Sequence, residues 1–210
     1  MTGIGVDPGV LPAFALTMAL IELTPGPNLA WLALLAASRG RGAGGLAVAG
    51  VTLGLLAWLL ATLFGLAGTP VFSSTGLELL RWAGAAYMVW LAWDAVRPSP
   101  PASGLDRDRP FLRGLVANLL NPKAAVFYVA LLPGFIRPTA GPIFVQILIL
   151  GSLHIAISVM VHGAVVLGAA EAAARLAPPL VLAIRLFLAL GLLAATVWLL
   201  TLPLAPEAVA

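Results

Sequence analysis

The sequence contains no cysteine and little charge of either sign. The absence of cysteine excludes disulfides, thiolate nucleophiles and cysteine-ligated metal centres. Only 9% of the 210 residues are charged, whereas 61% are hydrophobic, and the mean hydropathy is +1.08. A soluble domain needs a more polar surface than this composition supplies. The chain is therefore predicted to be an integral membrane protein.

A dense basic patch is also missing, although the net charge is +3 and the pI is about 10.2. The basic residues are spread over the short breaks between apolar runs, which argues against nucleic acid as a partner. The N-terminal stretch MTGIGVDPGV lacks the basic segment of a signal peptide, so we expect the first apolar run to be retained. We expect no cofactor.

Six apolar runs are long enough to cross a bilayer, whose core of about 30 Å requires about 20 helical residues. They cover residues 10–37, 43–66, 76–96, 111–136, 142–170 and 178–202. The pattern predicts an all-α membrane protein that forms a single transmembrane domain over residues 1–210.

Basic residues mark one side of the predicted membrane. The loops after the first, third and fifth runs contain Arg39, Arg41, Arg97, Arg107, Arg109, Arg113 and Arg175. Arg137 alone lies in a loop on the other side. The positive-inside rule therefore places the odd-numbered loops in the cytoplasm and both termini outside.

One long connection, PSPPASGLDRDRP at 98–110, divides the chain into repeats at 10–97 and 111–202. Each repeat has three predicted spans, an odd number, so the repeats must be inverted relative to each other. Each also begins with a span broken near its centre, at TPGP in the first helix and at NP in the fourth. Inverted-repeat transporters place their binding sites at such breaks.

The breaks predict two helix starts near mid-membrane. Thr24 before Pro25, and Asn121 before Pro122, each fit an N-cap followed by proline at the first helical position. A backbone freed by proline and glycine must face protein or a wet cavity in lipid. Helix N-termini carry free N–H groups and partial positive charge, so two converging starts would form a carboxylate receptor.

Glu22 and Lys123 supply charge beside the breaks. A charged residue at mid-membrane costs about 2.5 to 3.5 kcal/mol on insertion scales, so such residues are functional hypotheses by default. We interpret Glu22 as a proton carrier or a ligand for a substrate ammonium group. The alternative is a permanent ion pair between Glu22 and Lys123 that only ties two spans together.

A polar stripe occurs in the fifth run, where His154, Ser158 and His162 recur every four residues. Such histidines could relay protons, and His154 is a candidate for proton coupling. Hydrogen bonding between helices by neutral histidines is the interpretation we favour. Asp94 fits a local pair with Arg97, with a gate or second proton site as its alternative. No HExxH spacing accompanies these residues, so no metal site is expected.

Small residues form two surfaces for close helix packing. Gly50 and Gly54 make a GxxxG pair, and Gly84 lies in the stretch AGAA. Such surfaces pack helices inside one protomer or between two copies, and a homodimer is possible.

Four stretches resemble the motifs of the lysine exporter (LysE) superfamily, in its homoserine and threonine exporter branch. They are LTPGPN at 23–28, SRGRGAGGLAVAGVTLG at 38–54, LLRWAGAAYMVWLAWDAVR at 79–97 and FLRGLVANLLNPKAAVFYVALLPGF at 111–135. The resemblance implies a bacterial inner-membrane carrier that exports amino acids or their derivatives, driven by the proton gradient. It carries functional roles to Pro25, Gly26, Pro27, Asn28, Asn118, Asn121, Pro122 and Lys123.

The predicted function is secondary export of small neutral zwitterions by proton antiport, without enzymatic chemistry. The carboxylate would bind at the helix starts, including Thr24, and at Lys123, while Glu22 would hold the ammonium group. A metal-cation exporter of the same superfamily is the first alternative, but it would need more inward carboxylates than Glu22. An intramembrane enzyme is the second, and a protease would require paired aspartates, a serine dyad or zinc ligands.

Overall fold

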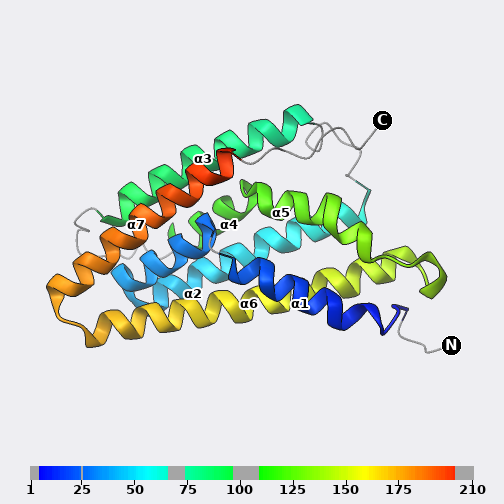
Figure 1. Cartoon of the computed structure of the whole chain (residues 1–210), viewed down its shortest axis with the longest axis horizontal. Helices are drawn as coiled ribbons and strands as arrows, with labels where there is room; N and C mark the ends of the chain where they lie inside the picture. The colour runs from blue at the N-terminus through cyan, green and yellow to red at the C-terminus, as the bar shows by residue number, and fades with distance from the viewer. Residues whose placement is uncertain (1–4, 25, 66–73, 97–108, 202–210) are drawn as a thin grey trace.

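The computed structural model describes residues 5–24, 26–65, 74–96 and 109–201, which are helical with short connections and contain no strand (Figure 1). The predicted all-α class is confirmed. The α-helices are α1 (Val10–Leu23), α2 (Pro27–Leu63), α3 (Ser74–Val96), α4 (Arg109–Leu119), α5 (Pro122–Val126), α6 (Ile143–Arg175) and α7 (Pro178–Thr201). A π-helix, η4 (Phe127–Leu131), and two 3₁₀ turns, η5 (Leu132–Phe135) and η6 (Pro138–Ala140), lie between α5 and α6.

The first break separates α1 from α2, but Thr24 does not cap α2. Its hydroxyl donates to the carbonyl of Leu20 at 2.7 Å, so Thr24 ends α1. The N-cap of α2 is Gly26, which is extended at φ −152° and ψ 168°, and Pro27 is the first helical residue. The predicted N-cap is therefore wrong, because Pro27 supplies the fixed φ that starts the helix. Pro25 lies outside the described residues.

The second break has the predicted cap. The side-chain oxygen of Asn121 accepts from the backbone N–H of Lys123 at 3.0 Å, and Pro122 is the first helical residue. Beyond Val126 the backbone forms the wider π-helix η4 and then the narrower 3₁₀ turn η5. Pro133 lies in η5 and cannot donate a backbone hydrogen bond or continue the α-helical ladder. The predicted fourth helix is therefore irregular beyond its break, which the sequence analysis did not foresee.

The chain reverses direction within α2, at Gly40. This residue has φ 80° and ψ 176°, a conformation that glycine adopts and other residues avoid. A Cβ atom on Gly44 would lie 3.2 Å from the Cβ of Ala36. In a straight helix two residues separated by eight positions are about 12 Å apart. The much closer approach of Gly44 and Ala36 therefore shows that the two arms of α2, 27–39 and 41–63, fold against each other. Figure 1 shows this reversal at the left end of the molecule.

Glycines bring α2, α3 and α4 into backbone contact. A Cβ atom on Gly50 would collide with the carbonyl of Phe111, and one on Gly114 with the carbonyl of Ala47. A Cβ on Gly84 of α3 would collide with the carbonyl of Leu120 at the second break. The small-residue surfaces are thus used inside the chain, where they hold α4 against the second arm of α2.

Two helices, α2 and α6, are each long and apolar enough to cross a membrane. The segment 122–135 passes the same test when joined to α4, at a bend of 50°. Helix α6 packs along α1 and α2, and α3 packs against α7. In Figure 1 the Gly40 reversal and the α6–α7 connection lie at one end of the molecule, and η6 lies at the other.

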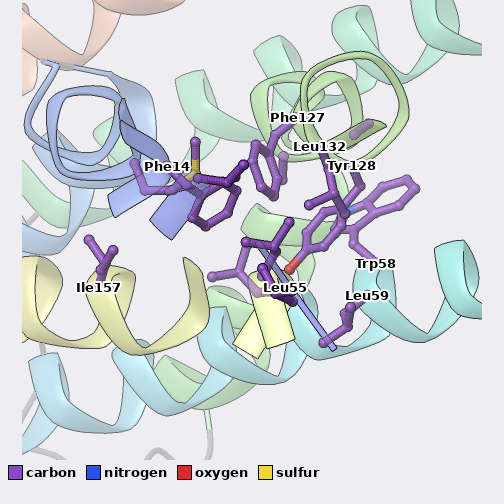
Figure 2. Close-up of a cluster of buried hydrophobic side chains, with 14 residues drawn as sticks. Phe14, Leu55, Trp58, Leu59, Phe127, Tyr128, Leu132 and Ile157 are labelled. Atoms are coloured by element: carbon purple, nitrogen blue, oxygen red, sulfur yellow. The ribbon is translucent and has the colours of Figure 1, made fainter. Parts of the chain in front are cut away.

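Two large apolar clusters and a small one of Leu34 and Ala189 form the described core. The first surrounds α5 and η4, where Phe127 faces Phe14 of α1 with ring centroids 6.2 Å apart (Figure 2). The second surrounds Trp31 of α2. On α6, Leu150 belongs to the first cluster and Val166 to the second, and a buried polar stripe lies between them. The core is therefore divided by a polar layer.

Candidate functional site

A cavity of about 30 Å³ lies in the polar layer, where the two breaks meet. One water needs about 10 to 15 Å³ on this measure, so the cavity holds about two waters and is too small for an amino acid. Its wall comes from both breaks, from α6 and from the second arm of α2: Ile21, Glu22, Thr24, Gly26, Pro27, Asn28, Leu29, Leu55, Asn118, Asn121, Lys123, Ala124, Phe127, His154, Ser158 and His162.

Most of the predicted site residues meet in this wall, although they come from opposite halves of the sequence. Pro122 is buried but does not line the cavity. Asp94 lies in α3, which contributes nothing to the wall, and its side chain is outside the described part of the structure. The proposed role of Asp94 therefore stays a prediction.

Glu22 is held by two histidines. It is 8% exposed, and its Oε1 and Oε2 atoms lie 3.0 Å from His154 Nε2 and 3.2 Å from His162 Nε2. Among the described residues, Glu22 forms no ion pair with Lys123 and its carboxylate contacts the two histidines instead, so the alternative of a direct Glu22–Lys123 pair is wrong. The histidines do join helices, as expected, but they do so through the central carboxylate.

Ser158 lies between His162 and Glu22. Its Oγ atom is 3.1 Å from His162 Nδ1 and 3.5 Å from Glu22 Oε2. All three residues of the polar stripe line the cavity, although only His154 was predicted from sequence as a site residue. Their spacing of four residues was the available signal, because it places all three side chains on one face of α6.

Lys123 reaches across to α1, where its Nζ atom donates to the carbonyl of Ile21. This carbonyl lies in the last turn of α1, where the helix leaves acceptors free and concentrates partial negative charge. The end of α1 therefore provides partial negative charge beside the Lys123 ammonium group. Lys123 and Glu22 still line the same cavity.

Two buried asparagines, one from each half of the sequence, line the cavity. Asn28 is 7% exposed and Asn118 is 2% exposed, and neither side-chain oxygen has a hydrogen-bond partner. Buried acceptors are nearly always paired, so these oxygens are available to a donor. Within the described residues, no group of His, Cys, Asp or Glu is arranged to hold a metal ion.

Residues 19–203 match the family described as LysE type translocator. The chain belongs to this family. The chain is 34% identical to the homoserine/homoserine lactone efflux protein of Salmonella typhi over 155 residues. The aligned region covers 71% of this chain and 75% of the relative. No solved structure is significantly similar to it.

Other relatives are named for amino-acid export. The threonine efflux protein of Escherichia coli (strain K12) is 27% identical over 140 residues, which are 60% of this chain and 68% of that protein. The cysteine/O-acetylserine efflux protein of Escherichia coli O1:K1 / APEC is 31% identical over 134 residues, with 63% and 69% covered. The LysE-family chain is thus related to efflux proteins for amino acids and their derivatives.

Proposed function

We propose that this chain is a secondary exporter of small neutral amino acids, driven by proton antiport across the bacterial inner membrane. The observation that carries the proposal is the meeting of both helix breaks around one cavity that contains Glu22 and Lys123. The names of three relatives, which export homoserine, threonine and cysteine or O-acetylserine, support the substrate class.

The substrate carboxylate binds at Lys123 and at the first turn of α2. That turn has N–H groups with no partner inside the helix, and its partial positive charge favours an anion. The corresponding groups of α5 are already occupied, because Asn121 accepts from the N–H groups of Lys123 and Ala124. We therefore assign the carboxylate to α2 alone, rather than to both helix starts.

The substrate ammonium group binds at Glu22, with the free side-chain oxygen of Asn28 as a further acceptor. A single buried carboxylate balances one positive charge. A cationic substrate such as lysine would bring a second ammonium group, and the described wall contains no other carboxylate. A neutral zwitterion is the substrate that leaves no charge in the cavity unpaired.

Six spans in two inverted repeats give this site its position near mid-membrane. In this arrangement α1 and the first arm of α2 form one broken span, and α4 to η5 form the other. Arg41 follows Gly40 in the chain, Arg175 is the last residue of α6, and Arg137 directly precedes η6. In Figure 1 the reversal of α2 and the C-terminal end of α6 lie at one end of the molecule, and η6 lies at the other. The positive-inside rule then places both termini outside, and a homodimer is compatible with the arrangement.

Transport requires the two apolar clusters to separate in turn. The cavity is too small for an amino acid, and each cluster closes one side of the polar layer. Movement of one repeat against the other would open one side at a time. A proton that enters from outside neutralises the negative charge around Glu22 and weakens its hold on the ammonium group, so the substrate is released outward.

A substrate panel in proteoliposomes tests the proposal. Vesicles with an acidic interior should accumulate labelled homoserine, threonine and cysteine in unchanged form, because antiport drives substrate toward the acidic side. Lysine and glutamate should accumulate poorly. A chemically modified product would indicate an enzyme, and accumulation of no amino acid would contradict the assigned function.

A further inference from the structure

The two histidines that hold Glu22 have different surroundings on their second ring nitrogen. Both direct Nε2 at the carboxylate, which can only accept hydrogen bonds when it is ionised. Both rings therefore have the Nε2–H form in that state. What distinguishes them is Nδ1, the position at which a neutral ring of this form would take up a further proton.

Nδ1 of His162 faces a group that suits either protonation state. Ser158 Oγ lies 3.1 Å away, and a hydroxyl both donates and accepts. When His162 is neutral, the Ser158 hydroxyl donates to Nδ1. When His162 is protonated, Nδ1–H donates to Ser158 Oγ, and the hydroxyl hydrogen turns toward Glu22 Oε2, 3.5 Å away. No buried polar group loses its partner in either state.

Nδ1 of His154 has no such partner. The atom is buried without a hydrogen bond, and the ring packs against Phe127 and Tyr128 with centroids 4.1 and 5.7 Å away. A proton on this nitrogen would create a buried, charged N–H donor without an acceptor, and such unpaired donors strongly disfavour the protonated form. The surroundings of Nδ1 therefore favour the neutral form of His154.

We propose that His162, with Ser158 as its hydrogen-bond switch, is the histidine that takes up the coupled proton, while His154 is a neutral positioning residue for Glu22. Besides Glu22, the titratable groups that face the two histidines are Lys123 of α5 and Tyr128 of η4. The residues that α2 contributes to the cavity wall are not titratable. Sequence named Glu22, Asp94 and His154 as candidates for proton coupling, and His162 here takes the place of His154. Its coupling step rests on the proposed antiport, but the protonation difference does not.

Nitrogen NMR can test the protonation difference directly, since the chain contains only two histidines. The full chain, purified with a histidine-free tag and labelled with ¹⁵N-histidine, should give two ring systems that His154→Gln and His162→Gln assign. When the pH is lowered stepwise, the ring signals of His162 should change to those of imidazolium. His154 should keep the neutral Nε2–H form throughout. Titration of His154, or of neither ring, would overturn the proposal.

Transport measurements then test coupling, with the ratio of homoserine uptake with and without a pH gradient as the readout. Ser158→Ala and His162→Gln should reduce this ratio to one. Ser158→Thr keeps the hydroxyl and should restore the wild-type ratio. A normal ratio in Ser158→Ala would contradict the switch. Failure of the wild type to exchange any amino acid would instead contradict the proposed function and leave the NMR result standing.

Discussion

Replacing Glu22 by Gln should reduce gradient-driven export by about 150- to 5,000-fold. Removing one partner of a buried charge pair costs about 3 to 5 kcal/mol, and each 1.36 kcal/mol corresponds to a tenfold change. Glutamine preserves the shape of the side chain but cannot balance a substrate ammonium group. Glu22 is also the residue around which both histidines are arranged, so its loss affects substrate binding and coupling together.

Export by the Glu22→Gln variant would be measured in proteoliposomes against Glu171→Gln, a matched control. Glu171 pairs with Arg175 at 2.6 Å on an exposed part of α6, and we expect its replacement to have little effect. If Glu22→Gln transported as fast as wild type, with the same dependence on the pH gradient, both roles assigned to Glu22 would be wrong.

Replacing Gly50 by Ala should destabilise the folded protein by about 3 kcal/mol or more, at the upper end of overpacking effects. The added methyl group would meet the backbone carbonyl of Phe111, which cannot move aside as a side chain can. Separation of α4 from α2 would also displace Asn118, whose side chain contacts Gly54. We therefore expect lower thermal stability in detergent together with impaired transport.

Gly45→Ala is the matched control, because Gly45 lies on the same arm of α2 and a Cβ there would meet nothing within 4 Å. Alanine also favours helix over glycine, so this variant should be as stable as wild type or slightly more so. Equal melting temperatures for the Gly50 and Gly45 variants would show that α2 and α4 do not approach as closely as the structure indicates.

The helix breaks could be predicted from sequence because their signals are local. Asn121 followed by Pro122 specifies a capped start, and the structure has it. The first break contains two prolines, and sequence alone does not determine which of them begins the helix. Pro27 does so, and Thr24 bonds backward to Leu20 instead of forward.

The partners of the charged groups could not be predicted, because they depend on how distant helices pack. The spacing of His154 and His162 places them on one face of α6 but does not say that this face meets α1. The sequence offered Glu22 as a possible ion-pair partner for Lys123, yet Lys123 donates to a backbone carbonyl at the end of α1. Sequence therefore predicted most of the residues that line the cavity, while packing decided the contacts of Glu22 and Lys123.

A structure determined with bound homoserine would test the central claim most directly, since it locates the substrate without relying on transport rates. The account predicts homoserine in an enlarged cavity between the two breaks. Its ammonium group should lie at hydrogen-bond distance, about 2.7 to 3.2 Å, from Glu22, and its carboxylate should face Lys123 and the first turn of α2. Homoserine bound elsewhere, or with its carboxylate toward Glu22, would contradict the account.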